Sequence, residues 1–181
     1  AALVLGDNIV HSDGISGIMD RAAKDFDGAT IFGHRVPDPE RFGVIEFDAD
    51  MNVLSLEEKP AHPKSDTIAI GIYLFDNTAC KRVKSLKPSA RGELEVLDLC
   101  RSYLDEGRLS VRMLDDDTAW FDAGTFDSLL ETSNYIKAKE DAGEPVLCPE
   151  LIAVRNGFVS GSDMLESLKD RKSPYYMRII E

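Results

Sequence analysis

The sequence predicts an α/β layer fold, and three patterns in its 181 residues support that class. Apolar runs rich in β-formers alternate with helical patterns through residues 1–140. Short segments rich in Gly, Asp and Pro separate these runs, as turns do. Helical spacing dominates residues 141–181. We therefore expect a sheet with helices over residues 1–140 and a C-terminal helical subdomain over residues 141–181.

The composition limits the classes of function. Hydrophobic residues make up 43% and charged residues 30% of the chain, which is a globular balance. The net charge of −12 disfavours nucleic-acid binding, because such a surface repels phosphate backbones. No apolar run approaches the roughly 20 residues of a membrane span. Three widely spaced cysteines argue against a disulfide framework or a zinc site and favour a reducing cytoplasm.

The elements expected in the first half are mostly strands. Residues 1–5 are uniformly apolar and end at Gly6, which predicts a short, fully buried strand. Residues 12–26 are expected to be a helix because apolar side chains recur there at helical spacing. β-rich runs predict strands at residues 29–36, 43–47, 53–57 and 68–75, and the turn at 48–52 joins the middle two as a hairpin.

The second half mixes helices with two more strands. Asp76 can cap a helix that extends to about residue 86, and Gly107 ends a helix expected over residues 93–104. Strands are expected at 109–114 and 119–121, after which Thr125 can begin a long helix. Further helical regions are expected at 149–156 and 162–170, and residues 175–180 as a strand or an ordered tail.

Two aspartates follow apolar strands and are candidate metal ligands. Asp7 ends the first strand, and Asp122 ends the strand at 119–121. Ligands of open α/β sheets lie at the carboxyl ends of strands, and Mg²⁺ is commonly held there by one or two carboxylates. The alternative is ordinary turn chemistry, since Gly-Asp-Asn favours turns and Asp122 can start one before Thr125. The spacing does not show whether the two carboxylates meet.

The segment Glu57-Glu58-Lys59-Pro60 places charges at a strand end. Neighbouring strand residues face opposite ways, so only one of Glu57 and Glu58 can point into a given site. A carboxylate can accept sugar hydroxyls, and a lysine can hold a phosphate as a point charge. The alternative is a solvated edge of the sheet.

One arginine and two glycines complete the candidates. Arg91 lies in a loop before a helix, where it can bind phosphate or simply pair with Glu93 or Glu95 on the surface. Gly43 and Gly71 lie in strands, where the missing Cβ would let a ligand approach the backbone.

These segments, taken in order, resemble the glucose-1-phosphate thymidylyltransferases. The matching strings are L-V-L-G-D-N-I, D-P-E-R-F-G-V-I-E-F-D, L-E-E-K-P, I-G-I-Y-L-F-D, L-K-P-S-A-R-G-E-L-E, A-W-F-D-A-G-T and C-P-E-L-I-A. The resemblance implies a three-layer α/β/α nucleotide-diphospho-sugar transferase-like fold around a mixed, mostly parallel sheet. It also implies nucleotidylyl transfer from dTTP to glucose 1-phosphate, which yields dTDP-glucose and pyrophosphate.

The resemblance also implies residue roles. Asp7 and Asp122 would hold Mg²⁺, and Lys59 and Arg91 would be the catalytic cations on the sugar phosphate. The sugar-binding positions would be Gly43, Glu58, Ile70, Gly71 and Trp120, the last by shaping the pocket. The family implies a homotetramer that serves dTDP-rhamnose biosynthesis. The charge, the lack of a long apolar run and the cysteine pattern predict a cytoplasmic protein that binds neither nucleic acid nor membrane.

The sequence departs from the family at its start. The family's Gly-rich nucleotide loop, roughly G-x-G-T-R-L-x-P, precedes the first strand and has no counterpart here. We therefore expect an N-terminally truncated fragment that holds the sugar and metal part of the site and is inactive alone. The base-reading segment is absent too, so a UTP- or CTP-using relative remains an alternative. So does a non-catalytic sugar-phosphate-binding or interaction module.

Overall fold

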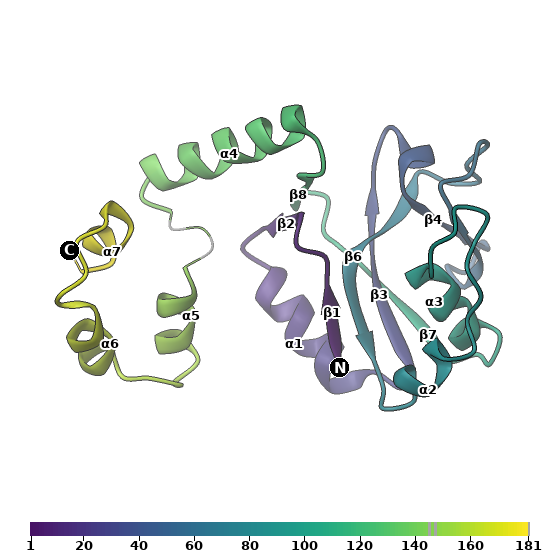
Figure 1. The fold of residues 1–181 in the computed structure, drawn as a ribbon, viewed down its shortest axis with the longest axis horizontal. Coiled ribbons are helices and arrows are strands. Elements are labelled where there is room, and N and C mark those ends of the chain that lie inside the picture. Colours follow the sequence, from purple (N-terminus) through teal and green to yellow (C-terminus); the bar gives the residue numbers. More distant parts are fainter. Residues whose placement is uncertain (145, 147, 181) are drawn as a thin grey trace. The chain divides into compact units, whose positions relative to one another are not determined.

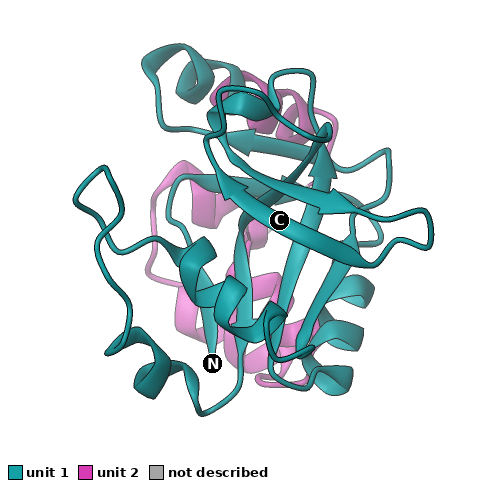
Figure 2. Ribbon diagram, turned by 90° about the vertical axis from the view of Figure 1, so that its right-hand side faces the viewer, with its two compact units in different colours: residues 1–132 teal, residues 133–181 magenta. Residues whose placement is uncertain are grey.

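The fold was determined as a computed structural model, which describes residues 1–144, 146 and 148–180 (Figure 1). The chain divides into two compact units, residues 1–132 and residues 133–181 (Figure 2). Unit 1 contains the sheets, and unit 2 is helical. Helix α4 (Phe126–Asp141) crosses the division between the two units at residue 132. The domain boundary that the sequence predicts, after residue 140, lies at the end of this helix and stays a prediction.

The larger sheet of unit 1 is built around its longest strand, β6. The strand order is β5-β4-β6-β3-β7, and β1 also pairs with β6. Along β6, Ala69 pairs with both β3 and β4, whereas Leu74 pairs with both β3 and β1. β4 and β1 therefore lie end to end along the same side of β6. The strand bounds are β1 Ala2–Val4, β3 Ala29–Arg35, β4 Gly43–Phe47, β5 Val53–Glu58, β6 Thr67–Phe75 and β7 Leu109–Met113.

The sheet is mixed, which confirms the predicted α/β class, but its pairings are not mostly parallel. Among the described strands, β3 and β7 pair in parallel, and every other pairing in this sheet is antiparallel. The expected majority of parallel pairs is wrong for this chain. A short turn joins the antiparallel neighbours β4 and β5, whereas the parallel strands β3 and β7 are separated in the chain by a long connection that includes α3 (Val96–Leu104).

Helices cover both faces of the sheet and give the expected three layers (Figure 1). On one face, α3 packs through Leu97, Cys100 and Tyr103 onto Ile31 and Ile45. On the other face, α1 (Ile15–Asp25) packs through buried Ile18 and Ala22 onto a second apolar cluster. That cluster contains Phe32, Ile68, Ile70 and Leu114. Alternate residues of β3 and β6 thus enter opposite cores, as the period of a strand requires.

A second, two-stranded sheet lies beside the first. β2 (Asn8–His11) and β8 (Ala119–Asp122) pair antiparallel, with Asn8 opposite Asp122 and Val10 opposite Trp120. The sequence predicts β8 but not β2, because residues 8–11 follow a Gly-Asp-Asn turn signal and form a run too short to stand out. This ribbon brings two segments together that lie more than a hundred positions apart in the chain.

The prediction that residues 1–5 are fully buried is wrong. Leu3 and Leu5 are each 39% exposed and Val4 is 57% exposed. Within the part of the chain that the structure describes, β1 pairs with β6 alone, so its other edge and much of its apolar surface face outward. An apolar run indicates what a strand can bury, but its burial depends on the neighbours that flank it.

The remaining helices include one that the sequence left ambiguous. Residues 175–180 belong to helix α7, so they are neither the strand nor the ordered tail that the sequence predicted. Among the described residues, no helix combines the length and the apolar character needed to cross a bilayer. The bounds are η1 Pro39–Arg41 and α2 Ala79–Val83 in unit 1, and α5 Pro149–Arg155, α6 Gly161–Leu168 and α7 Pro174–Ile180 in unit 2.

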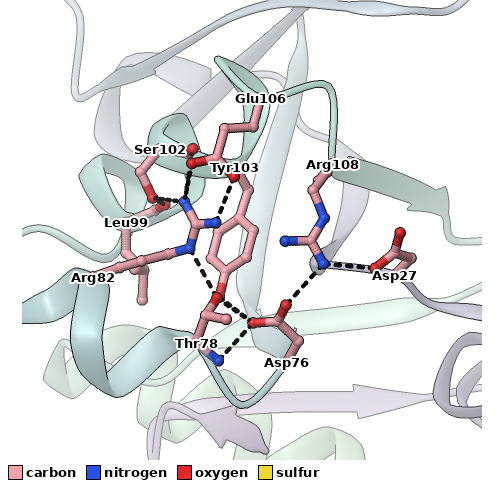
Figure 3. Close-up of polar contacts among 9 residues, drawn as sticks. All are labelled: Asp27, Asp76, Thr78, Arg82, Leu99, Ser102, Tyr103, Glu106 and Arg108. Atoms are coloured by element: carbon pink, nitrogen blue, oxygen red, sulfur yellow. Dashed lines mark hydrogen bonds and ion pairs between the residues drawn. The ribbon is translucent and has the colours of Figure 1, made fainter.

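One carboxylate, Asp76, ties the end of β6 to the elements around it (Figure 3). It accepts hydrogen bonds from the Thr78 backbone N–H at 2.9 Å and the Thr78 hydroxyl at 2.6 Å. The Tyr103 hydroxyl of α3 donates at 2.8 Å, and Arg108, just before β7, donates at 2.9 Å. Burial pushes the pKa of Asp76 upward, but these donors outweigh it and hold the pKa well below its usual range.

The guanidinium of Arg82 closes the same network from α2. It forms paired hydrogen bonds to Glu106 at 2.8 and 2.6 Å and lies 4.0 Å from the centre of the Tyr103 ring (Figure 3). The paired geometry is the stronger form of an arginine–carboxylate contact. The loops at this end of the sheet are therefore held by charge-assisted hydrogen bonds in addition to apolar packing.

We predict that Asp76→Asn lowers the unfolding free energy of unit 1 by about 2–3 kcal/mol, because charged hydrogen bonds are lost at a largely buried position. The folded-state pKa of Asp76 is depressed, so its stabilisation is present above the unfolded pKa of about 4 and fades as pH falls toward the folded value. The difference in unfolding free energy between the unmodified protein and Asp76→Asn should therefore narrow below about pH 4. Urea unfolding followed by the fluorescence of Trp120, the one tryptophan of the chain, measures both effects.

Asp116→Asn is the matched control, since the Asp116 side chain is 94% exposed and its ion pair with Arg35 spans 3.8 Å. It should change the unfolding free energy by less than about 0.5 kcal/mol. Equal losses in the two variants would contradict the role given to Asp76.

Candidate functional site

A pocket in unit 1 gathers most of the residues that the sequence singles out. It lies where the β2–β8 ribbon meets β4, β5 and β6 of the larger sheet. The predicted site residues that line it are Asp7, Gly43, Glu58, Lys59, Gly71, Trp120 and Asp122. They come from five segments that are far apart in the sequence, so it is the fold that brings them together.

The two aspartates meet, which the sequence could not show. The backbone N–H of Ala123 donates to the Asp7 carbonyl at 2.8 Å, continuing the β2–β8 pairing. A Cβ placed on Gly124 would lie 3.1 Å from Asp122 Oδ1 and 3.6 Å from Asp7 Oδ2. Each carboxylate therefore has an oxygen close to one point, the position that a Cβ at residue 124 would occupy.

This pair suits a hard divalent cation. Mg²⁺ prefers oxygen ligands and is typically bound by one or two carboxylates, with phosphate oxygens and water in the other positions. Across the described residues, no cluster of three or more His, Cys, Asp or Glu side chains gathers with metal-binding geometry. The donor set at Asp7 and Asp122 thus fits a metal shared with a phosphorylated ligand better than a closed protein cage.

Asn8 connects the ribbon to the larger sheet, and sequence reasoning missed its role. Its Oδ1 accepts from the Gly71 backbone N–H at 2.9 Å and from Trp120 Nε1 at 2.9 Å. Its Nδ2 donates to Asp7 Oδ1 at 3.0 Å. The side chain therefore positions the indole and one metal-candidate carboxylate together. The available signal was an amide next to a strand-end aspartate, which by itself is equally typical of a turn.

The alternation at the end of β5 places Glu58 in the pocket and Glu57 outside it. Glu57 pairs with Lys64 at 2.9 Å, away from the pocket, as the two-residue period requires. Lys59 follows with a φ of 46°, a left-handed conformation that costs a lysine about 1–2 kcal/mol. Its backbone N–H bonds to the Phe42 carbonyl at 2.9 Å, which holds that turn in place.

Glu58 lies in a partly desolvated, acidic setting. Burial raises its pKa, nearby Glu95 adds to the rise, and Lys59 and Arg91 oppose it. Its side chain is 24% exposed, and Arg91 donates to it at 3.3 Å. A half-buried carboxylate with one modest partner retains free acceptor capacity, as binding of a hydroxyl-rich ligand requires.

The strand period decides which residues of β6 reach the pocket. Ala69, Gly71 and Tyr73 line it. Ile70, which the sequence analysis assigned to the sugar site, has a fully buried side chain in the core beneath α1. The structure therefore places Ile70 on the opposite face and Ala69 in the pocket, because a shift of one residue along a strand reverses the face.

The two predicted glycines are sterically required to different degrees. A Cβ on Gly71 would lie 2.7 Å from Asn8 and 2.8 Å from the Leu5 Cβ, so the strand could not approach the ribbon. A Cβ on Gly43 would lie 2.4 Å from the end of Leu97, a side chain that can shift, and 3.3 Å from Glu58 Oε2.

Arg41 and Phe42 also line the pocket and were not predicted as site residues. A hydrogen bond to Asp38 raises the pKa of Arg41, so this cation stays charged at the pocket wall. The Phe42 ring meets Trp120 edge-on at 5.1 Å between centroids. Their strand-initiating position beside Gly43 was visible in the sequence, but nothing there distinguished them from an ordinary loop.

Arg91 lies at the rim, where it forms the carboxylate pairs that the sequence offered as one interpretation, while phosphate binding stays a prediction. It contacts Glu58 of the pocket at 3.3 Å. It also pairs with Glu93 at 2.7 Å and lies 3.9 Å from Glu95, the surface partners considered as the alternative. The side chain is 42% exposed and does not itself line the pocket.

Comparison with known proteins agrees with this arrangement. A profile described as nucleotidyl transferase matches residues 1–139. The chain belongs to the nucleotidyl transferase family. Among characterised relatives, the glucose-1-phosphate thymidylyltransferase of Neisseria gonorrhoeae is 46% identical over 175 residues, covering 96% of this chain and 61% of the relative. That of Mycolicibacterium smegmatis is 42% identical over 185 residues, covering 99% and 64%. The chain thus spans about three fifths of the length of these relatives.

Solved structures show the same fold. A Bacillus anthracis protein described as a glucose-1-phosphate thymidylyltransferase, in complex with a sucrose, is 38% identical with a TM-score of 0.63. The match covers 74% of this chain and 53% of that one. A UDP-glucose pyrophosphorylase bound to UDP-glucose has a TM-score of 0.67 at 19% identity, covering 76% and 56%, and it shows the likeness of fold alone.

We predict that Gly71→Ala disrupts the junction between the ribbon and the larger sheet, because its Cβ would displace Asn8. The Trp120 indole, which donates to Asn8, should then shift its fluorescence emission, and the unfolding midpoint in urea should fall. Gly161→Ala is the control, since a Cβ there meets nothing within 4 Å. Unchanged emission in Gly71→Ala would show that Asn8 does not hold Trp120.

Proposed function

We propose that this chain carries the acceptor half of a nucleotidyltransferase site that transfers a nucleotidylyl group from dTTP to glucose 1-phosphate, releasing pyrophosphate. The observation that carries the proposal is the meeting of the Asp7–Asp122 pair with Glu58 and Lys59 in one pocket. The curated relatives named above share this activity in their names. Since the chain spans three fifths of their length, the activity of the whole protein is part of the proposal.

The pocket residues suggest separate tasks. Glu58 would accept hydrogen bonds from the sugar hydroxyls, and Gly43 and Gly71 would let the sugar lie close to the strands. Lys59 and Arg91 would neutralise the phosphate, whose oxygen attacks the α-phosphorus of the nucleotide in line. Such a reaction needs no covalent protein intermediate, because positioning and charge neutralisation supply most of the rate. Trp120, fixed by Asn8, would close one wall of the sugar site.

Asp7 and Asp122 would hold Mg²⁺ in this scheme. The metal, when bound, would neutralise phosphate charge and polarise the phosphorus–oxygen bonds. Their adjacency across the β2–β8 ribbon supports this assignment, as does the oxygen-only donor set.

The names of the curated relatives support dTTP as the nucleotide, and the matches to these relatives cover nearly the whole chain. A UTP- or CTP-using enzyme is the alternative within the same class. The likeness to a UDP-glucose pyrophosphorylase concerns the fold and does not favour UTP.

The cellular setting belongs to the same proposal. Three free thiols, two of them buried, fit a reducing cytoplasm. A role in dTDP-rhamnose biosynthesis and a homotetrameric assembly are implied by the resemblance to the family. The net charge of −12 supports small phosphorylated ligands over nucleic acid as partners.

A non-catalytic sugar-phosphate-binding module is the second candidate, and the pocket residues that would hold the sugar phosphate serve it equally well. The two functions differ in a turnover assay with dTTP, glucose 1-phosphate and Mg²⁺. The chain alone is expected to bind the sugar phosphate without forming dTDP-glucose. Turnover by these residues alone would show that the nucleotide site is more complete than proposed.

Calorimetric titration with glucose 1-phosphate tests the acceptor site. We expect saturable binding that Lys59→Ala weakens at least tenfold, because the charge facing the phosphate is removed. Lys64→Ala is the control, since Lys64 pairs with Glu46 and Glu57 outside the pocket and should leave the affinity unchanged. Equal affinities in both variants would place the phosphate elsewhere.

The metal role is tested by Asp122→Asn. In an assay of dTDP-glucose formation on the longest form of the protein that its gene encodes, the variant should lose at least about 100-fold in turnover with Mg²⁺. Asp116→Asn, whose carboxylate lies outside the pocket, should retain the full rate. An undiminished rate in Asp122→Asn would remove the carboxylate from the metal site.

A further inference from the structure

The loop that carries Arg91 is built as a closed turn at the rim of the pocket. The Ser89 backbone N–H donates to the Glu93 carbonyl at 2.8 Å, and the Gly92 N–H donates to the Ser89 carbonyl at 2.9 Å. The Ser89 hydroxyl accepts from the Arg91 N–H at 3.1 Å and donates to Glu95 at 2.7 Å. Gly92 adopts a φ of +77°, which only glycine adopts readily. The turn therefore sets Arg91 and its acidic neighbours at fixed positions.

This turn surrounds the Arg91 guanidinium with carboxylates. Glu93 lies at 2.7 Å, Glu58 at 3.3 Å and Glu95 at 3.9 Å. Glu58 lines the pocket, whereas Glu93 faces solvent with 61% of its side chain exposed. Two N–H groups of the guanidinium thus already donate to the protein's own carboxylates, to Glu93 at 2.7 Å and to Glu58 at 3.3 Å.

The strengths of these contacts decide what a phosphate can displace. An exposed ion pair contributes about 0–1 kcal/mol, so the Glu93 contact is easily exchanged for a dianionic ligand. The same carboxylate would then lie close to the bound phosphate and repel it. Glu93 thus weakens phosphate binding in two ways, by competing for Arg91 and by adding negative charge at the rim.

We propose that Glu93 is an internal counter-anion that latches Arg91 at the pocket rim, so that a sugar phosphate must displace Glu93 in order to bind this guanidinium. The latch makes Glu93 a positioning residue that lowers the affinity of the site for phosphate. The latch also couples phosphate binding to sugar binding. When Arg91 moves to the phosphate, Glu58 loses its contact with Arg91 and can accept further hydrogen bonds from the sugar hydroxyls. The inference rests on the proposed function for the identity of the ligand.

Calorimetry on the 181-residue chain measures the predicted effect. Glu93→Gln should bind glucose 1-phosphate, and inorganic phosphate as a second probe, about two- to five-fold more tightly than the unmodified protein. Glu57→Gln is the matched control, because it removes the same charge from β5, where Glu57 pairs with Lys64 outside the pocket. It should leave the affinities for glucose 1-phosphate and inorganic phosphate unchanged. The tighter binding of glucose 1-phosphate by Glu93→Gln should vanish in NaCl on the order of 0.5–1 M, because salt at that concentration screens exposed charges. An effect of the substitution on the structure would persist in salt.

A ligand-free readout separates the latch from the identity of the ligand. Carboxylates that cover the guanidinium should slow its modification by phenylglyoxal, so mass spectrometry should find Arg91 labelled about two- to five-fold faster in Glu93→Gln than in Glu57→Gln. Equal labelling rates, or affinities in Glu93→Gln no higher than in the control, would overturn the latch. If glucose 1-phosphate fails to protect Arg91 in every variant, the proposed acceptor site is wrong, while faster labelling in Glu93→Gln still supports the latch.

Discussion

The side chain of Asn8 joins the two sheets of unit 1, and the geometry of the candidate site depends on that junction. One oxygen receives both the Gly71 backbone N–H and the Trp120 indole N–H, and the amide nitrogen reaches Asp7. Because the acceptor has two lone pairs, it can satisfy both donors at once. Without a Cβ on Gly71 the ribbon approaches the sheet closely enough for these bonds to form. The aspartate pair therefore faces the sugar-binding candidates of β5 and β6.

Charge is distributed unevenly around this junction. The chain as a whole is strongly acidic, yet Arg41 and Lys59 line the pocket and Arg91 lies at its rim. Local cations govern a phosphate more than the net charge does, since screening limits distant charges to about a Debye length. The carboxylates of the pocket lining, Asp7, Glu58 and Asp122, and the acidic partners of Arg91 oppose the field of these cations.

Local patterns singled out many of the residues that line the pocket, because these residues lie at strand ends. Asp7 and Asp122 each follow an apolar strand, and the strand period separated Glu57 from Glu58. The resemblance also implied Ile70, which the structure places in the core on the opposite face of β6. Asn8, Arg41 and Ala69 escaped notice because their roles come from contacts with segments far away in the chain. Residues 1–5 were expected to be buried from their composition, but exposure depends on which strands lie beside them.

The sequence by itself determined the α/β class, most element positions and the residue types that can bind a sugar phosphate and a divalent cation. Apolar periodicity and turn residues encode these properties locally, so they can be read without a partner segment. Only the tertiary structure decided that Asp7 and Asp122 each have an oxygen close to one point, that most strand pairs are antiparallel, and that Arg91 is held by carboxylates. These outcomes depend on long-range pairing, which the free energy of the whole fold selects and no local pattern specifies.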